Sequence, residues 1–290
     1  ILAEHLGFSV WLLWSVVVVS LPGAGFAFSV DQLFWLVALP SLVGATLRLP
    51  YTFAVPVFGG RNWTVISALL LLVPTALLAW CVADPETSYG MFLVAAATAG
   101  VGGGNFASSM VNIAYFYPER HKGVALGVNA AGGNVGVAGV QLGVPLVISW
   151  GTGTNLAYAG LVWMPLVIVA AACAFVFMDN LSVIRSDVRG QLVGARRRQT
   201  WIISFLYVGT FGSFMGYAAA FPLLIGIEFP EVTVGHFAFL GALVGSASRP
   251  LGGLLADRLG GARITAWSFI GLAAGTVIML AVLGSFPAFL

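Results

Sequence analysis

Residues 100–139 decide the fold of this chain and read GVGGGNFASSMVNIAYFYPERHKGVALGVNAAGGNVGVAG. Two apolar runs, each interrupted by glycine and asparagine, flank a charged turn at 118–122. So many glycines would destabilise a helix in water, but in a lipid bilayer the helix persists because the backbone must satisfy its own hydrogen bonds. Glycines four residues apart, here the pairs 100/104, 123/127 and 132/136, also let a second helix approach closely. The stretch therefore predicts two closely packed membrane helices.

The composition of the whole chain also indicates a membrane protein. Of 290 residues, 60% are hydrophobic and 8% are charged, against about 25% charged in an ordinary soluble domain. The net charge of +2 is dispersed over short loops, which excludes a nucleic-acid partner. Cys81 and Cys173 have no metal-type spacing, so we expect them to be apolar packing residues and expect no metal or cofactor.

The apolar runs predict nine membrane spans, because about 20 apolar residues cross the hydrocarbon core. The one long connection, at 179–199, contains five arginines and is predicted to be a cytoplasmic linker. We therefore expect an all-α polytopic membrane protein with a six-helix amino-terminal half at 1–178 and the first three helices of a carboxy-terminal half at 200–290. The predicted spans are 8–28, 33–57, 63–83, 89–116, 123–149, 157–178, 200–225, 236–256 and 264–286.

The distribution of lysine and arginine predicts the orientation of these spans. The basic residues of the connections, from Arg61 to Arg263, lie in alternate connections, and the opposite connections carry acidic residues such as Asp84 and Glu228. By the positive-inside rule, the amino terminus is cytoplasmic. We expect an integral protein of the bacterial plasma (inner) membrane that acts as a monomer within the lipid bilayer.

An internal repeat relates the two sides of the linker. Residues 42–48, LVGATLR, match residues 243–249, LVGSASR, at an offset of 201, and the Gly-Gly pair at 59 recurs at 260. Both copies have the same topology, as expected for two halves related by an axis along the membrane normal. On this logic the full protein has twelve spans. We therefore expect three more after Leu290, and the start without methionine agrees with a fragment.

Arg48 and Arg249, the repeat-related pair, are the two basic residues that lie inside predicted spans. A charge at membrane depth is costly and marks a functional site with a partner. No Asp or Glu falls within the predicted spans and His236 stands only at the first residue of one, so we expect the partner to be a transported anion held between the halves. A planar guanidinium suits a small planar oxyanion. The alternative is that both side chains snorkel to the interface, which leaves their matching positions unexplained.

Further candidates lie in the fourth, fifth and seventh predicted spans. An amide side chain can donate to an anion or bond to a neighbouring helix. Tyr207 and Phe211, four residues apart, can wall a small cavity or serve packing alone. The amide residues are Asn105, Asn112, Asn129, Asn134 and Gln141.

Three motifs resemble a known family. Residues 253–260, GLLADRLG, are similar to the loop motif G-x-L-A-D-R-x-G of the major facilitator superfamily. Residues 123–136, GVALGVNAAGGNVG, resemble the nitrate signature in the fifth helix of its nitrate/nitrite porter family, and NFASSM at 105–110 resembles the segment before it. The resemblance covers essentially the whole chain. The family's second signature, in helix 11, would fall after Leu290.

This resemblance implies the major facilitator fold, with about nine of twelve helices in this chain, and a set of site residues. It places the arginines that clamp the anion at Arg48 and Arg249, the substrate-contacting asparagine at Asn134, and aromatic residues of the site at Phe106, Tyr207 and Phe211. We expect conformational or gating roles for Gly127, Gly132, Gly133, Gly136, Asp257 and Arg258.

The sequence therefore favours a secondary transporter of nitrate and/or nitrite that works by alternating access and is not an enzyme. Two uncompensated positive charges make the empty carrier reluctant to reorient, which favours nitrate/nitrite antiport. Nitrate/proton symport and transport of another small anion, such as formate or a dicarboxylate, stay open. A redox enzyme would need intramembrane His or Cys ligands, and a channel would need several weaker sites in series.

Overall fold

Helices make up all the regular structure of the computed structural model in the residues that it describes, 1–150, 154–181 and 193–289. Nine helical segments of these residues are long and apolar enough to cross a membrane, which confirms the all-α polytopic class. The elements are α1 (Leu2–Trp11), α2 (Trp14–Ser20), η1 (Pro22–Ala24), α3 (Val30–Phe58), α4 (Gly60–Leu70), α5 (Leu72–Cys81), α6 (Tyr89–Phe116), α7 (Glu119–Ile148), α8 (Ala157–Leu161), α9 (Trp163–Phe177), α11 (Arg198–Tyr207), η2 (Val208–Gly212), α12 (Ser213–Glu228), η3 (Val234–His236), α13 (Ala238–Leu259), α14 (Gly261–Val282) and α15 (Phe286–Phe289).

Several of these described spans are interrupted helices. α1 and α2 form the first span, α4 and α5 the third, and α8 and α9 the sixth. Pro74 and Pro165 lie within one turn of the second and third of these breaks, where a proline removes a helical hydrogen bond and clashes with the preceding turn. In the seventh span a π-helical turn, η2, joins α11 to α12.

The first span begins earlier than the sequence predicts. It runs from Leu2 to Ser20 rather than over 8–28, so Glu4 and His5 lie inside it. α1 packs against α6 and α7, and Glu4 is only 2% exposed. The expectation that no acidic residue or histidine lies within a span is therefore wrong at Glu4 and His5, and Asp31, Glu228 and His236 also fall at the ends of described spans. The continuous apolar run starts after Glu4 and His5, but the packed helix includes them.

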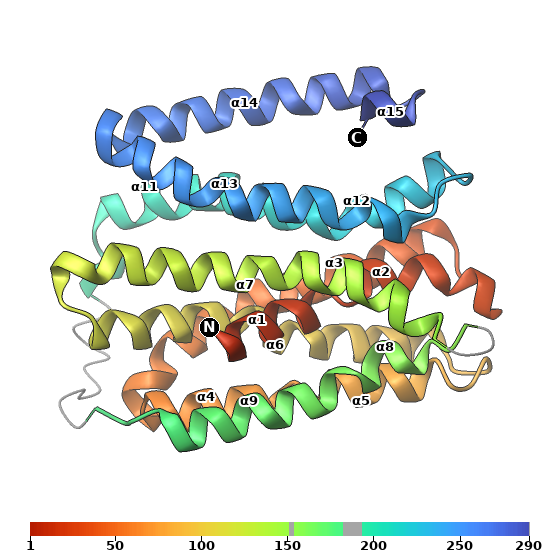
Figure 1. Cartoon of the computed structure of the whole chain (residues 1–290), viewed down its shortest axis with the longest axis horizontal. Coiled ribbons are helices and arrows are strands. Elements are labelled where there is room, and N and C mark those ends of the chain that lie inside the picture. Colours follow the sequence, from red (N-terminus) through yellow and green to blue (C-terminus); the bar gives the residue numbers. More distant parts are fainter. Residues whose placement is uncertain (151–153, 182–192, 290) are drawn as a thin grey trace.

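The helices lie side by side in a bundle (Figure 1). α14 lies at one edge of the view and α4, α5 and α9 lie at the other, with α7 between them. The later spans pack on the first six through α13 against α7 and through α12 against α2 and α3. Large apolar side chains on α14, such as Trp267 and Ile270, are exposed, as suits a surface in lipid.

Glycines permit the close packing that the opening stretch predicts. A methyl group added at Gly100 would overlap Val43 and the backbone of Gly44, so glycine is needed where α6 approaches α3. A methyl group at Gly136 would likewise overlap the backbone carbonyl of His5, where α7 approaches α1. Both helices of the 100–139 stretch therefore present glycine to a neighbouring backbone.

The sequence repeat has a structural counterpart at the ends of two helices. α3 is followed by Gly59 with φ of +84°, and α13 by Gly260 with φ of +92°. Side chains disfavour this left-handed region, whereas glycine adopts it freely. α4 and α14 begin immediately after these residues. The same helix–turn–helix geometry therefore recurs at the predicted offset.

The predicted linker at 179–199 lies partly outside the described residues, which omit 182–192 and with them Arg185 and Arg189. Its final residues are described, and α11 begins at Arg198. The division into halves at 1–178 and 200–290 stays a prediction, and Leu290 itself is not described.

Candidate anion site

Arg48 lies on α3, which contains Pro40 and Pro50 and still continues to Phe58. The side chain is half-buried, and its Nε donates a hydrogen bond to the carbonyl oxygen of Gly103 on α6 at 3.3 Å. Its Nη2 is buried and has no hydrogen-bond partner. Because a buried, unpaired donor is costly, this nitrogen marks a place where an acceptor can bind.

Three aromatic rings surround the Arg48 guanidinium. Its Cζ lies 4.7 Å from the ring centroid of Phe211, 4.9 Å from that of Phe106 and 5.4 Å from that of Trp11. Such cation–π contacts stabilise a positive charge without neutralising it. Arg48 therefore keeps its charge, and its free donor remains available.

Arg249, on α13, approaches one of the same rings. Its Cζ lies 5.2 Å from the centroid of Phe211 and 5.5 Å from that of Phe214. The two guanidiniums interact electrostatically with each other and with the Tyr207 hydroxyl. Within the described part of the chain, neither arginine forms an ion pair with a carboxylate. The structure thus brings the repeat-related arginines together around one ring, and within the described residues neither is paired with a carboxylate.

Phe211 reaches both arginines from the π-helical turn η2 and is 5% exposed. The Tyr207 ring stacks on it with centroids 5.0 Å apart and 9° between the planes, and Phe106 stacks at 5.6 Å and 20°. Single π-helical turns inside α-helices are frequent at functional sites. Here the turn sets a stacked row of three predicted site residues beside the arginines.

These contacts oppose the snorkelling alternative. Snorkelling would turn a guanidinium toward its helix end and the aqueous interface. Instead, the Arg48 guanidinium contacts α1, α6 and η2, and the Arg249 guanidinium contacts η2 and α12. Both charges therefore face the protein interior.

Asn134, on α7, is fully buried, and neither its amide oxygen nor its amide nitrogen has a hydrogen-bond partner. In the described residues it is not joined to Arg48 or Arg249 by a hydrogen bond. Its two free polar atoms are suited to a bound ligand, but its contact with the anion stays a prediction.

Other amides of the predicted set bond to neighbouring helices. Gln141 donates to the carbonyl oxygen of Ala218 on α12 at 2.6 Å, and Asn129 donates to the hydroxyl of Ser109 on α6 at 3.0 Å. For these two residues, the helix-bonding alternative describes what the structure contains.

The residues with predicted conformational roles have different surroundings. A methyl group at Gly133 or Gly136 would overlap α1, and at Gly132 it would overlap the side chain of Ile1, which precedes α1. At Gly127 it would meet nothing within 4 Å. Arg258 is exposed in the last turn of α13, and the side chain of Asp257 lies outside the described residues. The helix-end charge cluster stays a prediction.

Sequence reasoning missed the contribution of α1 to this site. Besides Trp11, the ring of Phe8 packs edge-on against Phe106 at 5.8 Å and Phe211 at 6.5 Å. Glu4, Phe8 and Trp11 have the i, i+4, i+7 spacing of one helix face. That spacing is a signal in the sequence, but a first span that begins at residue 8 includes Phe8 and Trp11 and leaves out Glu4.

The sequence model of the Major Facilitator Superfamily matches residues 6–290. The nitrate/nitrite transporter NarU of Salmonella typhimurium is 42% identical over 98% of this chain and 66% of its own length, and NarU of Escherichia coli is 41% identical with the same coverage. The probable nitrate/nitrite antiporter NarK2 of Thermus thermophilus is 39% identical over 92% of this chain and 65% of its own. The chain spans about two thirds of the length of these relatives, and the resemblance to nitrate/nitrite porters is confirmed.

Proposed function

Because this chain belongs to the Major Facilitator Superfamily, we propose that it forms the central anion site of a secondary transporter that moves nitrate and/or nitrite by alternating access. One observation carries the proposal. Arg48 and Arg249 meet around Phe211, no carboxylate of the described residues forms an ion pair with either, and Arg48 Nη2 is buried and unpaired. A small anion supplies both the missing charge and the missing acceptor. The names of the relatives support nitrate and nitrite as its identity.

The chemistry of the two side chains suits a planar oxyanion. A guanidinium presents a flat fork of N–H donors that can bind two oxygens of one anion, which an ammonium cannot do. Two such groups near one ring, one on α3 and one on α13, would hold an anion between the two repeats. The aromatic rings beside them exclude water, which strengthens the attraction between the charges.

Exchange of nitrate for nitrite is the mode that we propose from this charge pattern. A carrier with a bound anion has less net positive charge to move through its closed intermediate than an empty one. Reorientation therefore proceeds with an anion in each direction, and the name of the Thermus relative agrees with this mode. The glycine contacts of α6 and α7 would provide the surfaces along which the helices slide.

Nitrate/proton symport is the second candidate, and a specific observation favours it. Glu4 is buried within α1 and supplies a carboxyl group that could carry a proton. We place the protein in the bacterial inner membrane as a monomer with a cytoplasmic amino terminus, and we do not assign it an enzymatic activity. Formate and other small anions are separated from nitrate by competition with unlabelled anion.

Reconstitution of the full-length protein tests the proposal. Proteoliposomes loaded with nitrite should take up labelled nitrate, and Arg48→Lys or Arg249→Lys should lower this uptake about 10- to 100-fold, because the charge is kept but the two-oxygen geometry is lost. Arg263→Lys, at an exposed position on α14, is the control and should transport normally. Normal uptake by both site variants would refute the arginine clamp.

A further inference from the structure

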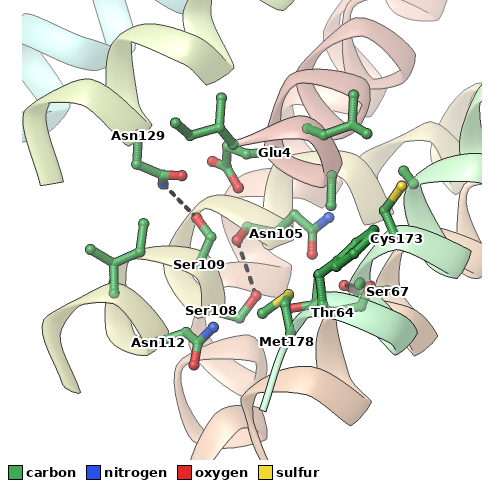
Figure 2. A pocket seen from close by; sticks show the side chains of 17 residues that line it. Glu4, Thr64, Ser67, Asn105, Ser108, Ser109, Asn112, Asn129, Cys173 and Met178 are labelled. Atoms are coloured by element: carbon green, nitrogen blue, oxygen red, sulfur yellow. Dashed lines mark hydrogen bonds between the residues drawn. The ribbon is translucent and has the colours of Figure 1, made fainter. Parts of the chain in front are cut away.

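Glu4 lines a cavity of about 240 Å³ between α1, α4, α6, α7 and α9 (Figure 2). The residue is 2% exposed, and neither of its carboxylate oxygens has a hydrogen-bond partner. An ionised carboxylate without a partner is very costly to bury, and such a group takes up a proton instead. The arginine site does not use Glu4 in any contact described above. The buried carboxyl group of Glu4 therefore has no role in the anion site as described.

The cavity lining offers acceptors to Glu4. The amide oxygens of Asn112 and Asn129 are buried and unpaired, and the Asn129 nitrogen is already donating to Ser109. In Figure 2 the side chains of Glu4, Asn129 and Ser109 point toward one another. A protonated carboxyl has an O–H that can donate to such an acceptor, whereas a carboxylate can only accept. The lining is therefore suited to the protonated form.

Few charged or titratable groups of the described side chains face Glu4. Arg48 on α3 and the hydroxyl group of Tyr207 on α11 interact with it electrostatically, and Cys173 on α9 lines the same cavity. α4, α6 and α7 contribute serine, threonine and asparagine to the lining. His5, the next residue of α1, is bonded through Nδ1 to a carbonyl oxygen of α7. Arg48 is thus the cation that interacts electrostatically with Glu4 and also belongs to the anion site.

One face of α1 also connects the cavity to the anion site. Glu4 is one turn from Phe8 and two turns from Trp11, which is about 10 Å along the helix axis. Trp11 contacts the Arg48 guanidinium, and Phe8 packs on Phe211. A change in the charge of Glu4 therefore alters the electrostatic potential at Arg48, and packed side chains of α1 connect the two residues.

The cavity has a neighbour that leads toward a helix end. A second cavity of about 690 Å³ is lined by Phe116 and Tyr117 at the end of α6, and also by His121 and Asp179. On the predicted orientation, this end is cytoplasmic. The residues shared by the two cavities are Ile1, Asn112, Ile113, Phe177 and Met178. The two cavities therefore adjoin between the loop that joins α6 to α7 and Glu4, with Asn112 as the polar residue that they share.

We propose that Glu4 is a proton-binding site that couples proton movement to the anion held by Arg48 and Arg249, an inference that rests on the proposed function. When the anion leaves, Glu4 releases its proton, and the carboxylate becomes the counter-charge for the arginines. When an anion and a proton bind, each cancels the charge that the other adds. With Glu4 ionised, the empty carrier has the same net charge as the fully loaded one. The charge barrier that favours exchange is then removed, so both forms can reorient, and one proton accompanies each monovalent anion. Exchange of anions needs no change at Glu4.

The test separates net uptake from exchange in the full-length protein. Proteoliposomes that contain no nitrate or nitrite, in sodium-free buffer, receive nitrate under an inward proton gradient. The wild type should accumulate nitrate and acidify the lumen, read by a trapped pH dye. Glu4→Gln should lower both signals at least tenfold while nitrate/nitrite exchange at equal pH stays within about twofold. Glu86→Gln, at an exposed residue between α5 and α6, is the matched control and should behave as wild type.

Three outcomes overturn this inference without touching the proposed function. One is exchange by the wild type with no proton-driven uptake, a second is unchanged proton-driven uptake by Glu4→Gln, and a third is uptake driven by a sodium gradient instead. Loss of exchange in the wild type would refute the proposed function itself. If Glu4→Gln does not fold, Glu4→Asp, which keeps a titratable carboxyl, should retain proton-driven uptake, and its loss in a folded variant would count against the inference.

Discussion

At the residue scale, Phe211 joins the parts of the anion site. Its ring contacts both guanidiniums and stacks with Tyr207 and Phe106. A ring that contacts two positive charges fixes their positions and keeps water away from them. Phe211 therefore acts on the anion through the arginines.

Replacing Phe211 by leucine should weaken nitrate binding without unfolding the protein. The change removes two cation–π contacts worth about 0.5–2 kcal/mol each, so nitrate affinity should fall about tenfold. Phe221→Leu is the matched control, because this ring lies in the same span but packs on Tyr217 and Phe289. Calorimetric titration of the purified protein with nitrate measures both variants. Equal affinities would mean that Phe211 serves packing alone.

At the element scale, the contact between α3 and α6 sets the position of Arg48. Arg48 donates to the backbone of α6, and Gly100 permits this approach because a methyl group there would overlap α3. The same helix face brings Phe106 to the guanidinium. The glycines are thus structural conditions for the site, although they contact no anion.

Gly100→Ala should destabilise the protein by about 1–3 kcal/mol, as overpacking does in other close interfaces. Gly127→Ala is the paired variant, because that glycine faces open space, and it should be neutral or slightly stabilising through better helix propensity. Thermal unfolding in detergent compares them. Equal melting temperatures would contradict the packing argument, and a transport defect confined to Gly127→Ala would support the predicted conformational role of that residue.

The number and type of the spans could be predicted from the sequence, but not their interruptions. Hydropathy measures only the transfer of side chains into lipid, so it finds nine spans and gives no sign of η2 or of the break after α1. Hydropathy also predicts that the first span begins after Glu4. It takes no account of tertiary packing, which here buries an acidic residue inside the span. The repeat at an offset of 201 residues could still be predicted, because it is recognised by matching residues and does not depend on hydropathy.

At the scale of the whole molecule, the candidate site lies where the later spans pack on the first six. α12 and α13 bring Phe214 and Arg249 to a surface formed by α2, α3 and α7. Arg48 and Arg249 could be identified from the sequence because they occupy matching positions of the repeat and are the two basic residues inside predicted spans. Trp11 and the double contact of Phe211 could not be, because they depend on how three distant helices and one π-helical turn meet.

The central claim is that Arg48 and Arg249 hold one anion together, and a double-mutant cycle on nitrate affinity tests it most directly. Nitrate dissociation constants are measured for the wild-type full-length protein, Arg48→Lys, Arg249→Lys and the double variant. Each single change should cost about 10- to 100-fold in affinity. Because either loss already breaks the shared clamp, the double variant should lose clearly less than the product of the two. Losses that multiply in full, or no loss in either single variant, would contradict a joint site.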